Sequence, residues 1–317
     1  MHRSRRLFET GIPLAAITTV RVIAEDIKLA HSVFALPFAV LAASMAAYHA
    51  GGGRILWSDF WMALVLVVVA MVFARTAAML ANRIVDHRID AGNPRTQGRA
   101  IPSGRLPIRS AIVAFGVSVA GFFLVCVLFG VLRENWWPTI LGAPVLLWIT
   151  SYGLFKRFTW WCHAWLGASL GLSPIASAIA VDPASLSGPS IWLLGGMVTC
   201  WVAGFDVIYA LQDREVDRRD GLHSIPARFG VSGALLMSRA LHVVAVLFLF
   251  GVGRTEPGFG ALFMVAVGIV VTLLVIEHAT VHRWGTTRMA ITFVTINGLV
   301  SILVGAMGMV DLGLGAS

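Results

Sequence analysis

The sequence has little charge for its length. Only 13% of its 317 residues are Asp, Glu, Lys or Arg, whereas 58% are hydrophobic and the mean hydropathy is +0.83. A soluble protein could not bury so much apolar surface, so the composition indicates a protein that crosses the membrane several times. Cysteine is also scarce. Cys126, Cys162 and Cys200 stand in apolar runs without CxxC spacing, which indicates packing residues rather than disulfides or metal ligands.

The N-terminus shows no cleavable signal. Residues 1–28 are basic and weakly amphipathic, and no small-residue cleavage site follows a short apolar stretch. We expect residues 1–28 to form a cytoplasmic N-terminal segment, and residues 1–317 to form a single membrane-embedded domain.

Long apolar runs are what the chain has in abundance. Runs of about 17–25 residues, long enough to cross a bilayer as a helix, predict nine spans. These cover residues 29–50, 57–86, 108–132, 137–154, 161–181, 190–212, 231–253, 258–277 and 288–310. The predicted fold is therefore an all-α, polytopic membrane bundle.

Basic residues are distributed unevenly over the connecting loops. Of the 24 Lys and Arg residues, 20 fall in the N-terminal segment and in alternate loops, whereas Arg54, Arg133 and Arg254 fall on the opposite side. The positive-inside rule predicts a cytoplasmic N-terminus and cytoplasmic long loops, in a bacterial inner membrane. The formal net charge of +8 follows from this topology and suits an anionic membrane surface, so nucleic acid is not an expected partner.

Two acidic motifs stand where the second and sixth predicted spans end. Each places polar side chains at four-residue intervals, which fall on one face of a helix. The two sets are Asn82, Asp86 and Asp90 in the first motif and Tyr209, Asp213 and Asp217 in the second. Because four crossings separate the two spans, both motifs are predicted at the cytoplasmic face. This pattern suggests a parallel internal duplication with one site between two helix ends.

A further charged residue precedes each motif by about two helical turns. Arg75 stands seven residues before Asn82, and Asp206 stands seven residues before Asp213. Charged groups at that depth are costly unless they face a wet or protein-lined cavity. Each is therefore a candidate functional residue.

The two motifs favour binding of a metal and a diphosphate. Carboxylates at i and i+4 on two facing helices suit Mg²⁺, which takes oxygen ligands and retains waters and substrate phosphates. Such metal ions can neutralise a departing diphosphate. Basic side chains suited to phosphate fall in the same loops; they are Arg95, Arg99, Arg105, Lys156, Arg157, Arg214, Arg218, Arg219 and Arg228. A diphosphate held beside apolar helices implies a lipid tail lying between them.

These motifs and the loops after them resemble the UbiA family of intramembrane aromatic prenyltransferases. The resemblance covers nearly the whole chain and includes Arg99-x-x-Pro102-x-Gly104 and Gly221-x-x-Ser224. Within the family the sequence looks most like the 4-hydroxybenzoate polyprenyltransferases. The stretches 205–213 and 221–230 are similar to a branch assigned to menaquinone synthesis through futalosine. The resemblance implies transfer of a polyprenyl group from polyprenyl diphosphate to a ring carbon of a hydroxyaromatic carboxylate, either 4-hydroxybenzoate or a dihydroxynaphthoate, in ubiquinone or menaquinone synthesis.

The resemblance also implies roles for single residues. The implied Mg²⁺ ligands are Asn82, Asp86, Asp213 and Asp217, with Asp90 close by. The implied diphosphate contacts are Arg99, Lys156, Arg219, Tyr209 and His223. Arg75 matches a position proposed in the family for the acceptor carboxylate, and Arg157 is a second candidate. Asp206 either holds the acceptor hydroxyl or its proton, or pairs with Arg75 across the pocket.

Two positions depart from the family pattern. Many members have Asp directly after the motif Asn, whereas this chain has Arg83, so one potential metal ligand is missing. Many members also have Lys before the loop Ser, whereas this chain has His223. That phosphate contact would then be neutral or pH-dependent.

Other readings of the same features are weaker. A transporter or lipid carrier also combines internal repeats with charges in the membrane, but it places them near the midplane in broken helices. Membrane CDP-alcohol phosphotransferases use Asp-x-x-x-Asp, but their Asp-Gly-x-x-Ala-Arg run is missing here. His278 and His282 have the i, i+4 spacing of metal ligands, yet they fall in a predicted connector, so we interpret them as part of a solvated loop.

Overall fold

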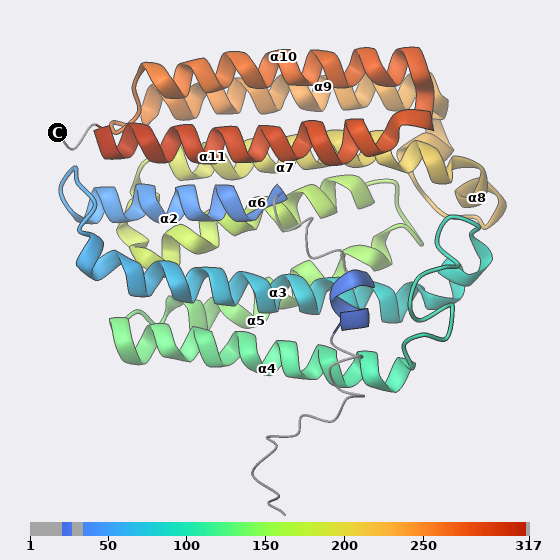
Figure 1. Cartoon of the computed structure of the whole chain (residues 1–317), viewed down its shortest axis with the longest axis horizontal. Coiled ribbons are helices and arrows are strands. Elements are labelled where there is room, and N and C mark those ends of the chain that lie inside the picture. Colours follow the sequence, from blue (N-terminus) through green and yellow to red (C-terminus); the bar gives the residue numbers. More distant parts are fainter. Residues whose placement is uncertain (1–20, 27–33, 315–317) are drawn as a thin grey trace, which may run out of the picture.

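A computed structural model describes residues 21–26 and 34–314, and within these ranges the chain is helical with no β-strand. Its long helices run nearly parallel in one bundle (Figure 1). They are α2 (Leu36–Ala50), α3 (Trp57–Gly92), α4 (Ile108–Arg133), α5 (Trp137–Phe155), α6 (Cys162–Val181), α7 (Ser190–Ala210), α9 (Ile225–Thr255), α10 (Ala261–Trp284) and α11 (Asn297–Leu314). The short elements are η2 (Pro183–Ser187), η3 (Leu211–Asp213), α8 (Arg214–Arg219), η4 (Gly285–Arg288) and the π-helical η5 (Ala290–Ile296).

The long helices match the predicted spans one for one. Among the described residues, eight helical stretches are long and apolar enough to cross a membrane, and the shorter α2 is a further apolar helix. The prediction of an all-α, polytopic membrane protein is therefore confirmed. The first predicted span, 29–50, begins partly outside the described residues.

Large apolar side chains on the outer surface fit this environment. Val113 on α4 is 66% exposed, Leu147 on α5 is 71% exposed and Leu247 on α9 is 64% exposed. In water such surfaces drive association, whereas acyl chains of a bilayer cover them. The outer faces of the bundle are therefore lipid-facing.

Helix α7 occupies the interior of the bundle and carries the second acidic motif at its end. Its Leu194, Met197 and Trp201 have no exposed surface. Glycines let α6 approach it closely: a Cβ on Gly171 would lie 2.1 Å from the Thr199 hydroxyl oxygen and 2.6 Å from a backbone oxygen of α7. Small residues commonly mark such helix contacts in membranes. This packing holds α7 closely against α6.

Several helix boundaries differ from the sequence prediction, among them the start of α9 at Ile225, six residues before its predicted start. Helix α3 continues to Gly92, six residues past the predicted end. After Ala210 the chain tightens into η3 and α8, so the second motif runs over the end of α7, η3 and α8 instead of one continuous helix. Helix α10 continues to Trp284, so the prediction of a loop is wrong for His278 and His282: both are helical, His278 is half-buried and His282 is exposed. The His278 imidazole instead lies 3.0 Å from that of His242 on α9.

Candidate active site

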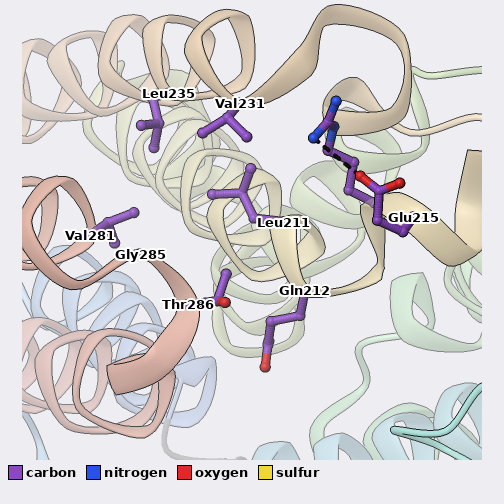
Figure 2. A pocket seen from close by; sticks show the side chains of 9 residues that line it. Leu211, Gln212, Glu215, Val231, Leu235, Val281, Gly285 and Thr286 are labelled. Carbon is purple, nitrogen blue, oxygen red and sulfur yellow. Dashed lines mark ion pairs between the residues drawn. The ribbon is translucent and has the colours of Figure 1, made fainter.

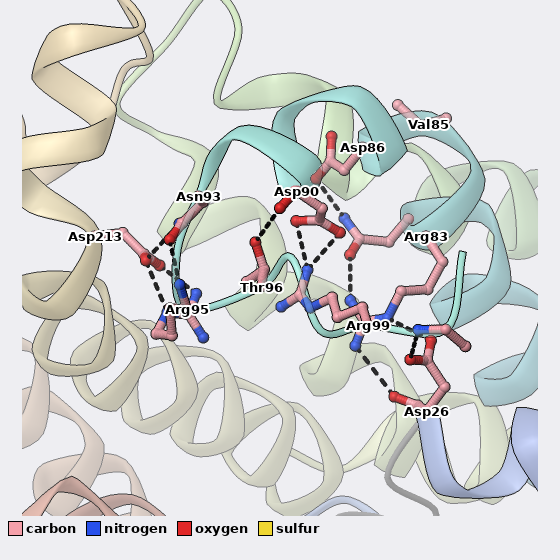
Figure 3. A network of polar contacts seen from close by, with 12 residues as sticks. Asp26, Arg83, Val85, Asp86, Asp90, Asn93, Arg95, Thr96, Arg99 and Asp213 are labelled. Atoms are coloured by element: carbon pink, nitrogen blue, oxygen red, sulfur yellow. Dashed lines mark hydrogen bonds and ion pairs between the residues drawn. The ribbon is translucent and has the colours of Figure 1, made fainter. Parts of the chain in front are cut away.

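The two acidic motifs meet at one end of the bundle, which we call the motif end (Figure 1). The Asn93 amide donates a hydrogen bond to the Asp213 carboxylate at 3.0 Å, and Arg95 Nε donates to the same oxygen at 2.8 Å. Arg219 donates to the Gly92 carbonyl at 3.1 Å. Side chains of the loop after α3 thus contact the second motif directly (Figure 3). Both motifs lie at the same end of the bundle, as the four crossings between their spans predict.

Arg95 makes three of the contacts that link the loop after α3 to the second motif. Besides its Nε bond, its Nη2 contacts the other Asp213 oxygen, and its Nη1 donates to the Tyr209 hydroxyl at 3.0 Å. Burial works against the charged guanidinium, but the hydrogen bond and the charge of Asp213 outweigh burial and raise the pKa of Arg95. The sequence placed Arg95 among the basic loops without giving it a specific role, because its partner lies 118 residues away.

Asp86 is the most buried carboxylate of the site, at 1% exposure. Lys156 Nζ lies 2.7 Å from one of its oxygens and Arg157 Nη2 lies 2.8 Å from the other. The Asn82 amide also donates to Asp86, at 3.1 Å. Lys156 and Arg157 follow the end of α5, so the segment after this helix places two basic side chains against the buried carboxylate of Asp86.

Asp90 has a basic partner of its own. Arg99 Nη1 donates to both carboxylate oxygens of Asp90, each at 2.7 Å, and Asp90 is 3% exposed. The Thr96 hydroxyl donates to the Asp90 carbonyl at 3.0 Å, which closes the turn after α3 (Figure 3). Arg99 and Lys156, both predicted to contact phosphate, therefore contact motif carboxylates in this structure.

The remaining residues of the second motif order the loop that leads into α9. Asp217 on α8 interacts with the hydroxyl of Ser224, which caps α9. The backbone N–H of His223 donates to the Lys156 carbonyl at 2.7 Å, while the His223 side chain is exposed. Arg219 pairs with its neighbour Asp220 at 2.7 Å. The structure thus places His223 and Arg219 at the edge of the site.

Arg83, the residue that departs from the family pattern, has a structural partner. It is 5% exposed, and its Nε lies 3.1 Å from Asp26 Oδ2. The other Asp26 oxygen accepts a hydrogen bond from the Ala100 backbone at 2.6 Å. Residues 21–26 of the expected N-terminal segment therefore pack against the motif end. The rest of that segment, residues 1–20 and 27–28, lies outside the described residues.

A cavity of about 1190 Å³ extends from the motif end into the bundle. Polar side chains line it near the motifs, namely Asn82, Arg95, Arg99 and Tyr209. Deeper in the bundle, Arg75, Tyr152 and Asp206 lie on its wall. Towards the opposite end the lining is apolar and includes Phe129, Trp137 and Leu141. The cavity can therefore accept a molecule with an anionic head and a long apolar tail.

His163 is a site residue that the sequence did not indicate. Its Nδ1 lies 2.7 Å from Asp206 Oδ2, and the imidazole is 3% exposed. The sequence suggested two partners for Asp206, Arg75 and a bound acceptor. The structure adds His163 as a further partner, and its contact with Asp206 is compatible with both interpretations. Because 43 residues separate His163 from Asp206, no local spacing in the sequence could have revealed the pair.

The carboxylates fit a magnesium ion that binds together with its substrate. Within residues 21–26 and 34–314, no three acidic, His or Cys side chains converge into a ready-made metal cage. Mg²⁺ needs no such cage, because it commonly takes one or two carboxylates and completes its shell with water and substrate phosphates. Asn82 and Asp86 on α3 offer oxygen donors of this kind, and Asp213 and Asp217 offer them on the facing segment.

A second, smaller pocket of about 300 Å³ lies behind the second motif (Figure 2). Leu211, Val231, Leu235 and Val281 form its apolar wall, and Arg214 and Glu215 form an ion pair at 3.2 Å on its rim. Asn82 and Tyr209 of the two motifs line the large cavity, whereas no residue of either motif lines this pocket. The large cavity is therefore the candidate active site.

Comparison with known protein families decides the identity of the chain. The model of the UbiA prenyltransferase family matches residues 35–307. This protein belongs to the UbiA prenyltransferase family. UbiA membership makes the protein a prenyltransferase, and it favours the enzyme over the transporter alternative. It also agrees with the resemblance seen in the two acidic motifs.

Individual UbiA relatives support the same assignment. The mitochondrial 4-hydroxybenzoate polyprenyltransferase of Arabidopsis thaliana is 35% identical over 192 residues, which cover 59% of this chain and 42% of that protein. The apo structure of a UbiA homolog from Aeropyrum pernix K1 has a TM-score of 0.76 at 31% identity, covering 89% of this chain and 98% of that one. A UbiA homolog from Archaeoglobus fulgidus, bound to DMAPP and Mg²⁺, has a TM-score of 0.64 at 17% identity over 94% and 99% of the two chains, which shows the shared fold.

Proposed function

We propose that this UbiA-family protein transfers a polyprenyl group from a polyprenyl diphosphate to a ring carbon of a hydroxyaromatic carboxylate and releases diphosphate. The main support is the cavity of about 1190 Å³, which joins an apolar interior to two facing acidic motifs. An apolar tail fits the interior, and the motif end supplies the charges that a diphosphate head requires. A relative named 4-hydroxybenzoate polyprenyltransferase supports an aromatic acceptor.

The charge balance of the motif end favours a divalent cation. Asp86, Asp90 and Asp213 are each paired with Lys or Arg. Such a site is close to neutral, so an incoming diphosphate adds negative charge that a bound cation would offset. Mg²⁺ would be held by Asn82, Asp86, Asp213 and Asp217, with Asp90 nearby, and would neutralise charge on the departing diphosphate.

The basic side chains have a second task once substrate arrives. Lys156, Arg99 and Arg95 each hold a motif carboxylate and end beside the space where the diphosphate would bind. We propose that they share their hydrogen bonds with phosphate oxygens, because Arg and Lys are suited to such contacts. Arg219, Tyr209 and His223 would contribute from the edge of the site.

The acceptor would bind deeper, beside the carbon that carries the diphosphate. Arg75 lies on the cavity wall and suits the acceptor carboxylate, whereas Arg157 is already engaged by Asp86. Asp206 would hold the acceptor hydroxyl or take its proton. The allylic C–O bond breaks, the ring carbon forms the new C–C bond, and the ring proton is lost. Apolar helices around the cavity exclude water, which would otherwise react with the allylic cation that develops as the C–O bond breaks.

Two acceptors fit this arrangement, 4-hydroxybenzoate and a dihydroxynaphthoate, in ubiquinone and menaquinone synthesis respectively. Both combine a hydroxyl with a carboxylate on an electron-rich ring. We propose that the motif end faces the cytoplasm of a bacterial inner membrane, because the basic loops of the chain lie on that side.

The test is prenyl transfer in membranes that contain the protein. Geranyl diphosphate, Mg²⁺ and either acceptor are added, and the prenylated product is identified by mass spectrometry. We expect Asp86→Ala and Asp213→Ala to abolish turnover while the protein remains in the membrane. Asp59→Ala is the matched control, because this exposed acid lies at the opposite end of α3. Full activity in either motif variant, or no product from the unmodified protein with both acceptors, would contradict the proposal.

A further inference from the structure

His163 connects three helices at the deep side of the active site. It lies near the start of α6 and is 3% exposed. Its Nδ1 lies 2.7 Å from Asp206 Oδ2 on α7, and its Nε2 lies 3.2 Å from the backbone nitrogen of Ile225, where α9 begins. Both ring nitrogens are therefore engaged by groups on other helices.

The two partners determine where the imidazole carries its hydrogen. A backbone N–H can only donate, so Nε2 must present its lone pair to Ile225. The ring hydrogen then sits on Nδ1, which donates to Asp206. This hydrogen-bond pattern makes Nδ1 of the imidazole the donor and Oδ2 of Asp206 the acceptor.

The same pattern excludes a proton relay through the ring. A relay would need Nε2 to release or receive a proton, but Nε2 faces a backbone N–H that has no proton to exchange in catalysis. Asp206 is 21% exposed and lines the cavity, so it is the member of the pair that a bound acceptor can reach. With Oδ2 engaged by His163, the carboxylate has a fixed orientation.

Ile225 also links His163 to the diphosphate side of the site. The two residues before it both contact the site. Ser224 interacts with Asp217, and the backbone N–H of His223 donates to the Lys156 carbonyl. Lys156 in turn holds Asp86. A short series of contacts therefore runs from the first acidic motif through the start of α9 to Asp206.

We propose that His163 is a positioning residue that orients Asp206 towards the aromatic acceptor and ties this orientation to the loop that begins α9. This inference rests on the proposed function, because it assigns Asp206 to the acceptor. His163 does not contact substrate. Its effect is transmitted through the hydrogen bond from Nδ1 to Asp206.

Two substitutions separate the two contacts of His163. The amide nitrogen of Asn reaches the position of Nδ1, so His163→Asn keeps a donor to Asp206 and loses the contact with Ile225. The amide of Gln reaches the position of Nε2, so His163→Gln keeps the contact with Ile225 and loses the donor. His242→Gln is the matched control, because His242 is equally buried at 3% and contacts the Trp201 carbonyl on another face of α7.

The experiment measures kcat and KM for each substrate in the full-length protein in membranes, together with thermal stability. We expect His163→Gln to lose at least about tenfold in kcat/KM for the acceptor, the loss of one charge-assisted hydrogen bond, with the KM for geranyl diphosphate nearly unchanged. His163→Asn should stay within about threefold of the unmodified protein, a residual effect expected of the weaker neutral bond to Ile225. His242→Gln should lower stability without changing either KM.

Equal acceptor kinetics in His163→Gln and His163→Asn would overturn the positioning role, as would equal losses for both substrates. An unmodified protein that makes no product with either acceptor would overturn the proposed function itself. The hydrogen position is tested separately by NMR of protein labelled with ¹⁵N-histidine. A hydrogen on His163 Nε2 instead of Nδ1 would contradict the inference whatever the activity shows.

Discussion

Replacing Arg95 with Ala tests whether the loop after α3 helps the two motifs act together. The guanidinium contacts both oxygens of Asp213 and the Tyr209 hydroxyl. A hydrogen bond to a charged group contributes about 1.5–3 kcal/mol when buried. The Arg95 and Asp213 side chains are 29% and 17% exposed, so solvent screening reduces the net effect to about 1–2 kcal/mol.

This free energy corresponds to about a 5- to 30-fold change in an equilibrium constant. We expect Arg95→Ala to raise the KM for prenyl diphosphate by that factor, because Asp213 and the loop lose their common anchor. The KM for the aromatic acceptor should change little. Arg95→Lys should give a KM for prenyl diphosphate between those of the unmodified protein and Arg95→Ala, since an ammonium cannot make all three contacts at once.

The assay is steady-state prenyl transfer with each substrate varied in turn. Arg218→Ala serves as the control, because Arg218 is an exposed basic residue on the neighbouring α8. A prenyl diphosphate KM that is unchanged in Arg95→Ala, or an effect confined to the acceptor, would refute the reasoning.

Three further predictions concern the acceptor, the N-terminal segment and helix packing. Arg75→Ala should raise the KM for the acceptor at least about tenfold, as expected for a lost charge-assisted contact, and equal losses for both substrates in the kinetic assay would count against this role. Arg83→Ala should destabilise the protein by about 3 kcal/mol because it leaves Asp26 as an unpaired buried charge, and thermal unfolding should show partial recovery in the double variant with Asp26→Ala. Gly171→Ala should lower the unfolding temperature by several degrees, because its methyl group would overlap the Thr199 side chain; an unchanged temperature would show that α6 and α7 can separate freely.

The sequence predicted the helices well because a membrane imposes a simple rule. A span needs a long apolar run, and such runs are visible without knowing what surrounds them. Boundaries were harder to predict where polar residues continue a helix. The predicted end of the eighth span stopped before His278, whose imidazole lies 3.0 Å from that of His242 on α9, a contact that the local sequence does not show.

The positions of the acidic motifs were also predictable, but their partners were not. The regular spacing placed Asp86 and Asp213 at the ends of two helices, and the four crossings between these helices placed both ends at the same face of the membrane. Nothing in the spacing showed that Lys156 and Arg157 would pair with Asp86, or that Arg95 would pair with Asp213. These pairs depend on how distant helices pack, which a single sequence does not display.

His163 illustrates this limit most clearly. A lone histidine at the start of an apolar run carries no motif, and its role becomes visible only when α6, α7 and α9 are packed together. The same holds for Arg83, which the sequence marked as a missing metal ligand. In the structure it has a different task, because it fastens residues 21–26 to the motif end.

The central claim is that Asp86 and Asp213 act on one bound magnesium diphosphate. The most direct measurement is a double-mutant cycle of Asp86→Asn and Asp213→Asn, read by calorimetric binding of a non-reactive prenyl thiodiphosphate in the presence of Mg²⁺. If both carboxylates hold the same ligand, the double variant should bind about as weakly as either single variant, with a coupling free energy of at least about 1 kcal/mol. Losses that simply add, or binding that is independent of Mg²⁺, would contradict the account.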